Sequence, residues 1–277
     1  MKQLSSLLLF CTTALLAAST VSPAPSSNSL VVYNSNIGLV FEKRDATLDK
    51  GINELIFPNV ARKINMSSIS LSLPGESALM MQQYRYDKIT LNKMLEASIG
   101  ENINYYTYNE NKRSQKKQGV LLAHHPILIK NRDNVVANVL ERDIVFDNVP
   151  TRLLTKPSLI WTIDTKEAVE GSMEISYLIS SIGWSANYVL NLKSEKKANL
   201  LGFITINNNS GKHYVDTKLT VLAGSVNRVQ EHEVMADNNI MYKQRTLMAR
   251  SAPKHIAVSG YHAYEVPFNV TLANNEE

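Results

Sequence analysis

After about residue 30, the chain consists of short runs in which apolar and polar residues alternate, separated by Asn, Gly, Pro and Asp. A period of two residues is typical of antiparallel strands, because successive side chains of a strand point to opposite faces. We therefore expect an all-β fold. The expected strands of the first half lie at residues 30–33, 37–44, 53–58, 67–73, 79–86, 103–108, 118–123, 126–130, 135–140 and 143–145.

One segment has the spacing of a helix. Asp87 is a suitable N-cap, Leu91, Met94 and Leu95 follow a spacing of three and four residues, and Gly100 can end the helix. We expect a single short connecting helix here. The short strands that follow it predict a small barrel-like unit at about residues 99–149.

A polar connector between Pro150 and Pro157 indicates a domain boundary. We expect an N-terminal β region at residues 30–150 and an antiparallel β-sandwich at residues 158–277. A turn-rich stretch at 207–211 favours a hairpin between strands at 200–206 and 214–222.

The clearest strand of the chain lies at residues 184–192. One face is apolar and the other polar, so we expect the first in the core and the second in water. The apolar face holds Trp184, Ala186, Tyr188, Leu190 and Leu192, and the polar face holds Ser185, Asn187 and Asn191.

The N-terminus has the features of a secretory signal peptide. Lys2 precedes an apolar run at residues 4–18, which is short for a membrane span. Small residues at 17 and 19 place the expected cleavage after Ser19, and an uncleaved anchor is the alternative. The Ser- and Pro-rich residues 20–29 predict a flexible tether. We expect an exported protein of the periplasm or cell envelope.

Composition narrows the possible functions. With 44% hydrophobic and 19% charged residues, the chain is of the folded globular class. A formal net charge of +4 is too small for a nucleic-acid-binding surface. The only cysteine, Cys11, lies in the leader. The mature chain is therefore expected to have no disulfide, no thiolate metal site and no cysteine nucleophile.

Candidate chemistry is sparse, and we expect no cofactor and no metal. The sequence has no phosphate loop, dinucleotide fingerprint or nucleophile elbow. His124 and His125 are adjacent, so on a strand they would point to opposite faces. Glu231 and Glu233, on one face of a strand, and Asp216 are the candidate acids if the protein is an enzyme. Trp184 and Tyr188 are a candidate aromatic binding platform, although the core is the favoured interpretation.

Several segments carry a resemblance to a known family. They are Gly183-Trp184-Ser185-Ala186-Asn187-Tyr188, Asn209-Ser210-Gly211 followed by Tyr214, Leu222-Ala223-Gly224-Ser225-Val226-Asn227-Arg228, residues 261–266 and 270–276, and earlier 31–41, 52–60 and 84–87. In this order and spacing they resemble the bacterial domain-of-unknown-function family forty-one thirty-nine, whose longer members are labelled mucoidy inhibitor A-like. The resemblance implies a secreted or envelope-associated β-rich protein without an assigned reaction, so it provides no catalytic residues.

The chain departs from this family in two ways. It has no long coiled coil, and it ends where the family continues with further strands. We therefore expect a truncated, incomplete sandwich and an oligomer formed through an exposed sheet edge.

These observations favour a non-catalytic exported envelope protein that acts as an interaction module for an envelope protein or a surface polymer. We expect no nucleic-acid partner and no membrane span in the mature chain. The alternatives are a hydrolase acting on a polysaccharide, and a factor that influences exopolysaccharide production. The last of these depends on the family resemblance alone.

Overall fold

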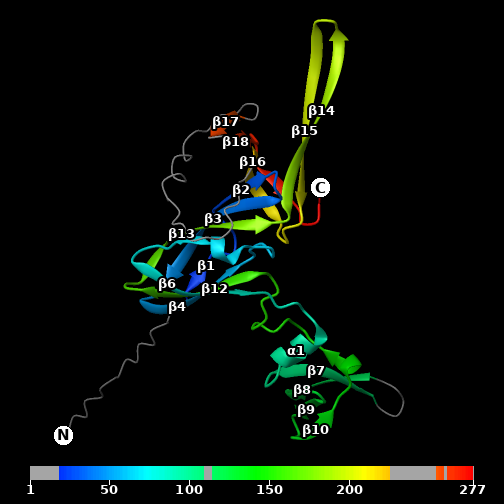
Figure 1. Ribbon diagram of the computed structural model, residues 1–277. Helices are drawn as coiled ribbons and strands as arrows, with labels where there is room; N and C mark the ends of the chain where they lie inside the picture. Colours follow the sequence, from blue (N-terminus) through cyan, green and yellow to red (C-terminus); the bar gives the residue numbers. More distant parts are fainter. Residues whose placement is uncertain (1–18, 109–113, 225–253, 259–260, 277) are drawn as a thin grey trace, which may run out of the picture.

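The computed structural model describes residues 19–108, 114–224, 254–258 and 261–276 (Figure 1). Strands predominate and one α-helix is present in this part of the chain, which confirms the all-β prediction. The elements before the helix are β1 (Thr20–Val21), β2 (Ser27–Tyr33), β3 (Ile37–Leu48), β4 (Gly51–Pro58), the 3₁₀ turn η1 (Met66–Ser68), β5 (Ser70–Ser72) and β6 (Ser77–Arg85).

The main body is a sandwich of two sheets. The larger has nine strands and follows the order β17-β18-β16-β2-β3-β13-β5, with β1 on β3 and β19 on β16. The smaller has the order β4-β12-β6. The strands from the second half of the chain are β12 (Ser158–Thr165), β13 (Val169–Ser180), β16 (Tyr214–Ala223), β17 (Lys254–Val258), β18 (Tyr261–Glu265) and β19 (Val270–Leu272).

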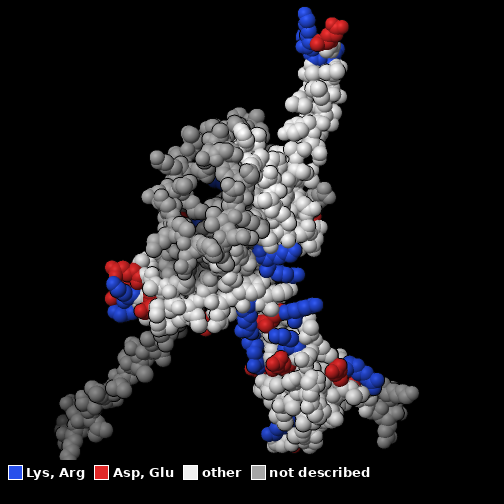
Figure 2. Space-filling model, viewed as in Figure 1, with Lys and Arg blue, Asp and Glu red and all other residues white. Residues whose placement is uncertain are grey.

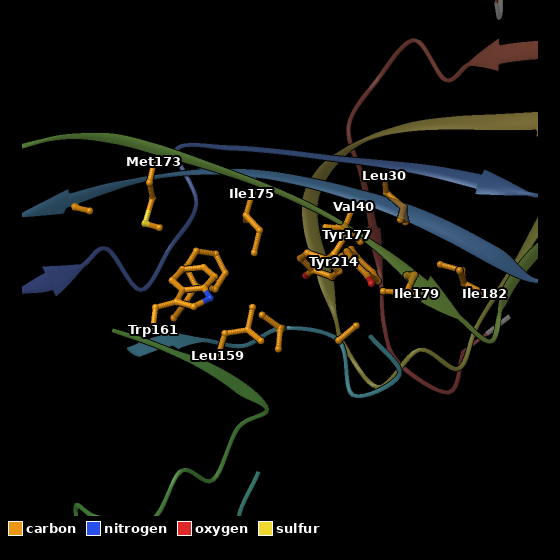
Figure 3. Packing of buried hydrophobic residues seen from close by; sticks show 14 of the residues in the cluster. Leu30, Val40, Leu159, Trp161, Met173, Ile175, Tyr177, Ile179, Ile182 and Tyr214 are labelled. Carbon is orange, nitrogen blue, oxygen red and sulfur yellow. The ribbon is translucent and has the colours of Figure 1, made fainter. Parts of the chain in front are cut away.

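The core lies between the two sheets (Figure 3). Trp161 and Leu159 of β12 face Met173 and Ile175 of β13 across the sandwich. The Trp161 side chain is fully buried, its Nε1 donates to Gln82 at 2.9 Å, and its ring centroid lies 5.1 Å from that of Phe57. Apolar side chains at alternate positions of each inner strand account for this packing.

A smaller unit lies below the sandwich in Figure 1. It contains α1 (Leu91–Ala97), β7 (Asn102–Tyr108), β8 (Ser114–His124), β9 (Ile127–Asn131), β10 (Val136–Asn138), the 3₁₀ turn η2 (Glu141–Asp143) and β11 (Ile144–Val145). Its own core contains Leu95, Ile103, Tyr105, Leu121, Ile127, Ile129 and Val139. The helix begins after Thr90, whose hydroxyl accepts from the Lys93 amide, so the predicted N-cap Asp87 is wrong.

The sheet of the smaller unit is open. Its order is β10-β9-β8-β7-β11, and the outer strands β10 and β11 do not pair with each other in the part of the chain that the structure describes. The barrel-like form predicted for this unit is therefore wrong. Two- and three-residue outer strands are too short to close a sheet on itself.

The smaller unit is an insertion into the sandwich. Strand β12 lies between β4 and β6, and β13 pairs with β3 along its whole length. The predicted division into a β region at 30–150 and a separate sandwich at 158–277 is therefore wrong, because strands from both sides of the insertion form the same two sheets.

Asp87 joins the two ends of the insertion. Its amide donates to the Leu154 carbonyl at 2.8 Å, and its carboxylate accepts from the Leu154 amide at 2.9 Å and from Arg85 Nε at 2.9 Å. The side chain is nearly buried. Burial raises its pKa, but the Leu154 amide, Arg85 and Lys93 outweigh burial and lower the pKa of Asp87 overall. The two segments that connect the insertion to the sandwich are thus held together by hydrogen bonds of Asp87.

The predicted flexible tether at 20–29 is also wrong. Thr20 and Val21 pair with β3, the amides of Ser22 and Ser26 donate to carbonyls of the same strand at 2.8 Å, and β2 begins at Ser27. These residues therefore follow one edge of β3, which supplies their backbone hydrogen bonds. The predicted signal peptide at 1–19 lies, except for Ser19, outside the described residues.

A long hairpin projects from the sandwich at the top of Figure 1. It consists of β14 (Ile182–Ser194) and β15 (Lys197–Asn208), which pair only with each other in the described structure. The predicted hairpin across 207–211 is wrong, because β16 instead runs parallel to β2. In that connection the Asn208 side chain donates to the carbonyls of Lys212 and Ala273, both at 2.9 Å, so the chain turns back into the body.

Candidate functional site: an apolar arm and the hollow at its foot

The hairpin of residues 182–208, here called the arm, has one wholly apolar face. Residues directly opposite each other on paired strands share a face. Beyond the foot of the arm, the register places on one face the pairs Ala186 with Ile204, Tyr188 with Gly202, Leu190 with Leu200 and Leu192 with Ala198. This set of eight residues is here called the apolar face.

The apolar face is open to solvent. The exposed fractions are 67% for Tyr188, 60% for Leu190, 76% for Leu192 and 64% for Leu200. The prediction that this face of the strand lies in the core is therefore wrong. The alternation and the strand agree with the sequence, but no second sheet covers the arm in the described structure.

The opposite face of the arm is mixed, and its tip is charged. The opposite face pairs Asn187 with Phe203, Val189 with Leu201 and Asn191 with Asn199. Figure 2 shows no charged side chain along the shaft of the arm, while Lys and Arg side chains and acidic side chains gather at its tip. The tip sequence is Lys193-Ser194-Glu195-Lys196-Lys197. The arm therefore has an uncharged shaft and a net positive end.

The structure separates the two aromatic residues of the predicted platform. Trp184 lies at the foot of the arm and is half-buried against the main core. Its Nε1 donates to the Leu222 carbonyl at 3.0 Å, and its ring packs edge-on against the Tyr264 ring, with 6.4 Å between the ring centroids. Tyr188 lies further out and covers Gly202, where an added Cβ would come within 3.1 Å of the Tyr188 ring. Trp184 thus fixes the arm to the body, and Tyr188 is available for binding.

A polar hollow of about 570 Å³ lies at the foot of the arm. Ser181 immediately precedes β14 and Asn209 immediately follows β15, so both lie where the arm joins the body. The residues lining the hollow are Asn36, Arg62, Lys63, Ser181, Asn209, Gly211, Asn274 and Asn275. No motif search would find this site, because its residues come from five separate segments and four of the eight are asparagines outside the strands.

The charge of the hollow is positive. Arg62 and Lys63 are the only charged residues among those that line it. The guanidinium of Arg62 donates to the Tyr86 hydroxyl at 3.3 Å and lies 5.1 Å from the centre of that ring, while Lys63 Nζ donates to Ser181 Oγ at 2.8 Å. Within the described ranges, neither cation forms an ion pair with a carboxylate.

A third polar cluster is buried inside the sandwich. Glu42 and Arg44 lie on the inward face of β3, and Arg44 donates to Glu42 Oε2 at 2.6 Å. Lys212 also donates to Glu42, and the Tyr177 hydroxyl donates to Glu42 Oε1 at 3.1 Å. One carboxylate thus serves two cations in a site closed to solvent. The sequence did contain a sign that these two charged residues are buried. The alternation through residues 37–48 places Glu42 and Arg44 on the same face of the strand as Val40.

The buried cluster shifts the pKa values of its members. Burial raises the pKa of Glu42, but Lys212 and Arg44 outweigh burial and hold the pKa of that carboxyl below its ordinary range. For Lys212, burial outweighs the attraction of Glu42 and lowers the pKa. The lowered pKa values of both Glu42 and Lys212 agree with a cluster in which two cations share one carboxylate. Because the cluster is enclosed, we assign it to stability.

Of the three candidate acids, only Asp216 lies among the described residues. Asp216 is exposed, and its carboxylate accepts a hydrogen bond from Asn269 at 2.9 Å. Glu231 and Glu233 lie outside the described residues. The described part of the chain contains no cluster of three His, Cys, Asp or Glu residues that could hold a metal ion, and its one α-helix is too short to cross a membrane.

The two adjacent histidines differ from the prediction. Strand β8 ends at His124, so His125 follows in a turn and the two rings lie 4.5 Å apart instead of on opposite faces. His125 Nε2 is 2.9 Å from Asn92 Oδ1. The pair is thus a local contact at the end of a strand.

No model of a known protein family matches this chain, and a search of curated proteins found no match. The resemblance to the bacterial family of unknown function therefore stays a prediction. Consequently, the arm and the hollow have to be interpreted from their own chemistry.

Proposed function

We propose that this protein is a non-catalytic, exported envelope protein that acts as a protein-interaction module, and that a second copy of the same chain occupies its arm. One observation carries the proposal: the apolar face of the arm is exposed over most of its length. Exposed contiguous apolar surfaces of this kind mark interaction sites in soluble proteins.

The backbone of the arm favours a protein partner over a lipid surface. Beyond its foot, each strand of the arm pairs on one side only in the part of the chain that the structure describes, so the outer edges of β14 and β15 present unpaired amides and carbonyls there. In a dimer formed by stacked faces these edges stay accessible to water, whereas in lipid hydrocarbon they would have no hydrogen-bond partner.

Charge and area favour a second copy. The apolar face carries no charged residue, so two identical faces can stack without repulsion. If the two arms run in opposite directions, their basic tips lie apart by about the length of the shaft, on the order of 25–30 Å and beyond the screening length. Two such faces would bury on the order of 1,000 Å² in total, which is near the lower limit of a specific interface. We therefore expect a weak, concentration-dependent dimer.

The test is sedimentation equilibrium of the mature chain over a wide concentration range. The double variant Leu190→Ser, Leu200→Ser removes the central pair of the apolar face and is expected to abolish the dimer. The matched control Val189→Ser, Leu201→Ser changes the neighbouring pair on the opposite face and is expected to retain the dimer. A wild-type chain that stays monomeric up to about 1 mM, or equal losses in both variants, would contradict the proposal.

Export is supported by the apolar N-terminal run and the small residues that end it. Fractionation of cells that produce the full chain is expected to yield a shortened product in the periplasm or envelope. A full-length cytosolic product would contradict this part of the proposal. No observation favours the hydrolase alternative.

A further inference from the structure

We propose that the hollow at the foot of the arm binds an acidic saccharide, meaning a sugar that carries a carboxylate or phosphate group beside its hydroxyls. This site is separate from the apolar face, and the inference does not depend on self-association.

The charge of the hollow selects an anion. Arg62 and Lys63 contribute two positive charges, and their hydrogen-bond partners, Tyr86 and Ser181, are neutral hydroxyl groups. A concave surface with charges of one sign concentrates counter-ions of the opposite sign. Arginine also matches the planar, two-oxygen geometry of a carboxylate or phosphate.

The frame of the hollow is rigid before any ligand arrives. Backbone hydrogen bonds join its segments: Ser181 N to Asn36 O at 3.1 Å, Asn209 N to Ser181 O at 2.8 Å, and Asn275 N to Asn208 O at 2.7 Å. Several lining residues hold a left-handed backbone, with φ of 63° at Asn36, 61° at Ser181, 86° at Gly211 and 61° at Asn275. A site formed in advance loses little entropy when it binds.

Gly211 fixes the position of Arg62. A Cβ at residue 211 would lie 2.4 Å from Cβ of Arg62, so only glycine allows this approach. The Gly211 amide in turn donates to Asn274 Oδ1 at 2.7 Å. The arginine therefore extends from a closely packed backbone at the wall of the hollow.

The asparagines select hydroxyl groups. A primary amide both donates and accepts hydrogen bonds, as a sugar hydroxyl does. Two of these amides are partly engaged within the protein, because Asn274 Oδ1 accepts from the Gly211 amide and Asn209 Nδ2 donates to Asn207. The asparagines that line the hollow are Asn36, Asn209, Asn274 and Asn275. Among the described residues, no aromatic ring lines the hollow. The volume of about 570 Å³ falls within the usual range for small-molecule sites.

The experiment is isothermal titration calorimetry of the full mature chain with four probes: a glucuronic acid oligosaccharide, glucose 1-phosphate, a neutral glucose oligosaccharide and inorganic phosphate. We expect one of the two acidic sugars to bind, which identifies the carboxylate or the phosphate as the recognised group. The neutral oligosaccharide is expected not to bind, and inorganic phosphate is expected to bind at least about tenfold more weakly than a binding sugar. Failure of both acidic sugars, or equal affinity for inorganic phosphate and glucose 1-phosphate, would overturn the inference.

Two double variants assign the binding to the hollow. Arg62→Gln, Lys63→Gln removes both charges at exposed positions and is expected to weaken binding by about tenfold or more. Lys193→Gln, Lys197→Gln removes the same charge at the tip of the arm and is expected to leave affinity unchanged. Equal losses in both variants would show non-specific attraction and overturn the inference. Sedimentation of the Arg62→Gln, Lys63→Gln variant separates this result from self-association, because the dimer is expected to persist.

Discussion

Strands β12 and β14 have the same alternating pattern, each with a tryptophan on its apolar face, but they have opposite environments. In β12, Trp161 is fully buried between two sheets, and the strand has a neighbour on each side. In β14, Trp184 is half-buried at the foot of the arm, and the rest of the apolar face is exposed. Alternation therefore predicts a strand and an apolar face, but it does not predict what covers that face.

The largest expected effect tests this contrast directly. Trp161→Ala should lower the free energy of unfolding by about 4–5 kcal/mol, because it opens a cavity in the core and leaves Gln82 without its donor. Trp184→Ala should cost about 1–2 kcal/mol, since it removes a half-buried ring and one hydrogen bond. Urea denaturation of both variants measures the difference. Equal losses would mean that the foot of the arm is as much a part of the core as β12.

The next effect concerns the buried charges of the body. Glu42→Gln removes the carboxylate that faces both Arg44 and Lys212, and should cost about 3 kcal/mol. Lys212→Met leaves the Glu42–Arg44 pair intact and should cost less than about 1 kcal/mol. Denaturation curves of the two variants decide between them. Equal losses of unfolding free energy in Lys212→Met and Glu42→Gln would contradict this expectation. They would show that the excess of two cations over one carboxylate in the cluster does not determine its effect on stability.

The same cluster should give the body a pH dependence. The pKa of Glu42 is lower in the folded chain than its ordinary value of 4.5, so its contribution is complete above that value and is lost as pH falls through the folded pKa. Wild-type stability should therefore decrease below about pH 4.5. Unfolding measured between pH 7 and pH 3 should show a shallower decrease for Glu42→Gln. Parallel curves for the two proteins would assign the acid sensitivity to other carboxyls, among them Asp87.

The smallest expected effect lies on the arm. Leu190→Ser, Leu200→Ser should change the unfolding free energy of the dilute, monomeric chain by less than about 0.5 kcal/mol, because both side chains are already exposed. Thermal melts at low concentration provide the measurement. A loss of 2 kcal/mol or more would show that the apolar face is covered by the chain itself, which would remove the contrast between the arm and the body.

The sequence predicted the positions of the strands and the helix better than it predicted which strands pair with each other. Alternation correctly located most strands, and the spacing of Leu91, Met94 and Leu95 located the helix. The connector at residues 150–157 does separate two sheets, but the strands before the insertion were assigned to the wrong domain because strand partners are selected over long distances. Strand β12 pairs with β4 and β6, on the far side of an insertion, and no local signal specifies those partners.

The candidate sites were harder to predict than the fold. The sequence indicated Trp184 and Tyr188, and only Tyr188 is open for binding. The hollow was missed, because its residues meet only after five chain segments converge, and because asparagine in a loop is ordinarily a turn residue. Glu42 and Arg44 could have been identified as buried from their position in the alternation of β3.

The insertion also has a consequence for the order of folding. Neither sheet of the sandwich can be completed from the first 85 residues alone, since the central strand of the smaller sheet is β12 and a neighbour of β3 is β13. The parallel partner of β2, β16, is synthesised later still. The hydrogen bond between the side chains of Asn28 and Thr217 joins residues 189 positions apart. Such high contact order makes folding slow. During synthesis the smaller unit, whose strands are all local, can therefore fold first, whereas the sandwich lacks its core until most of the chain has been made.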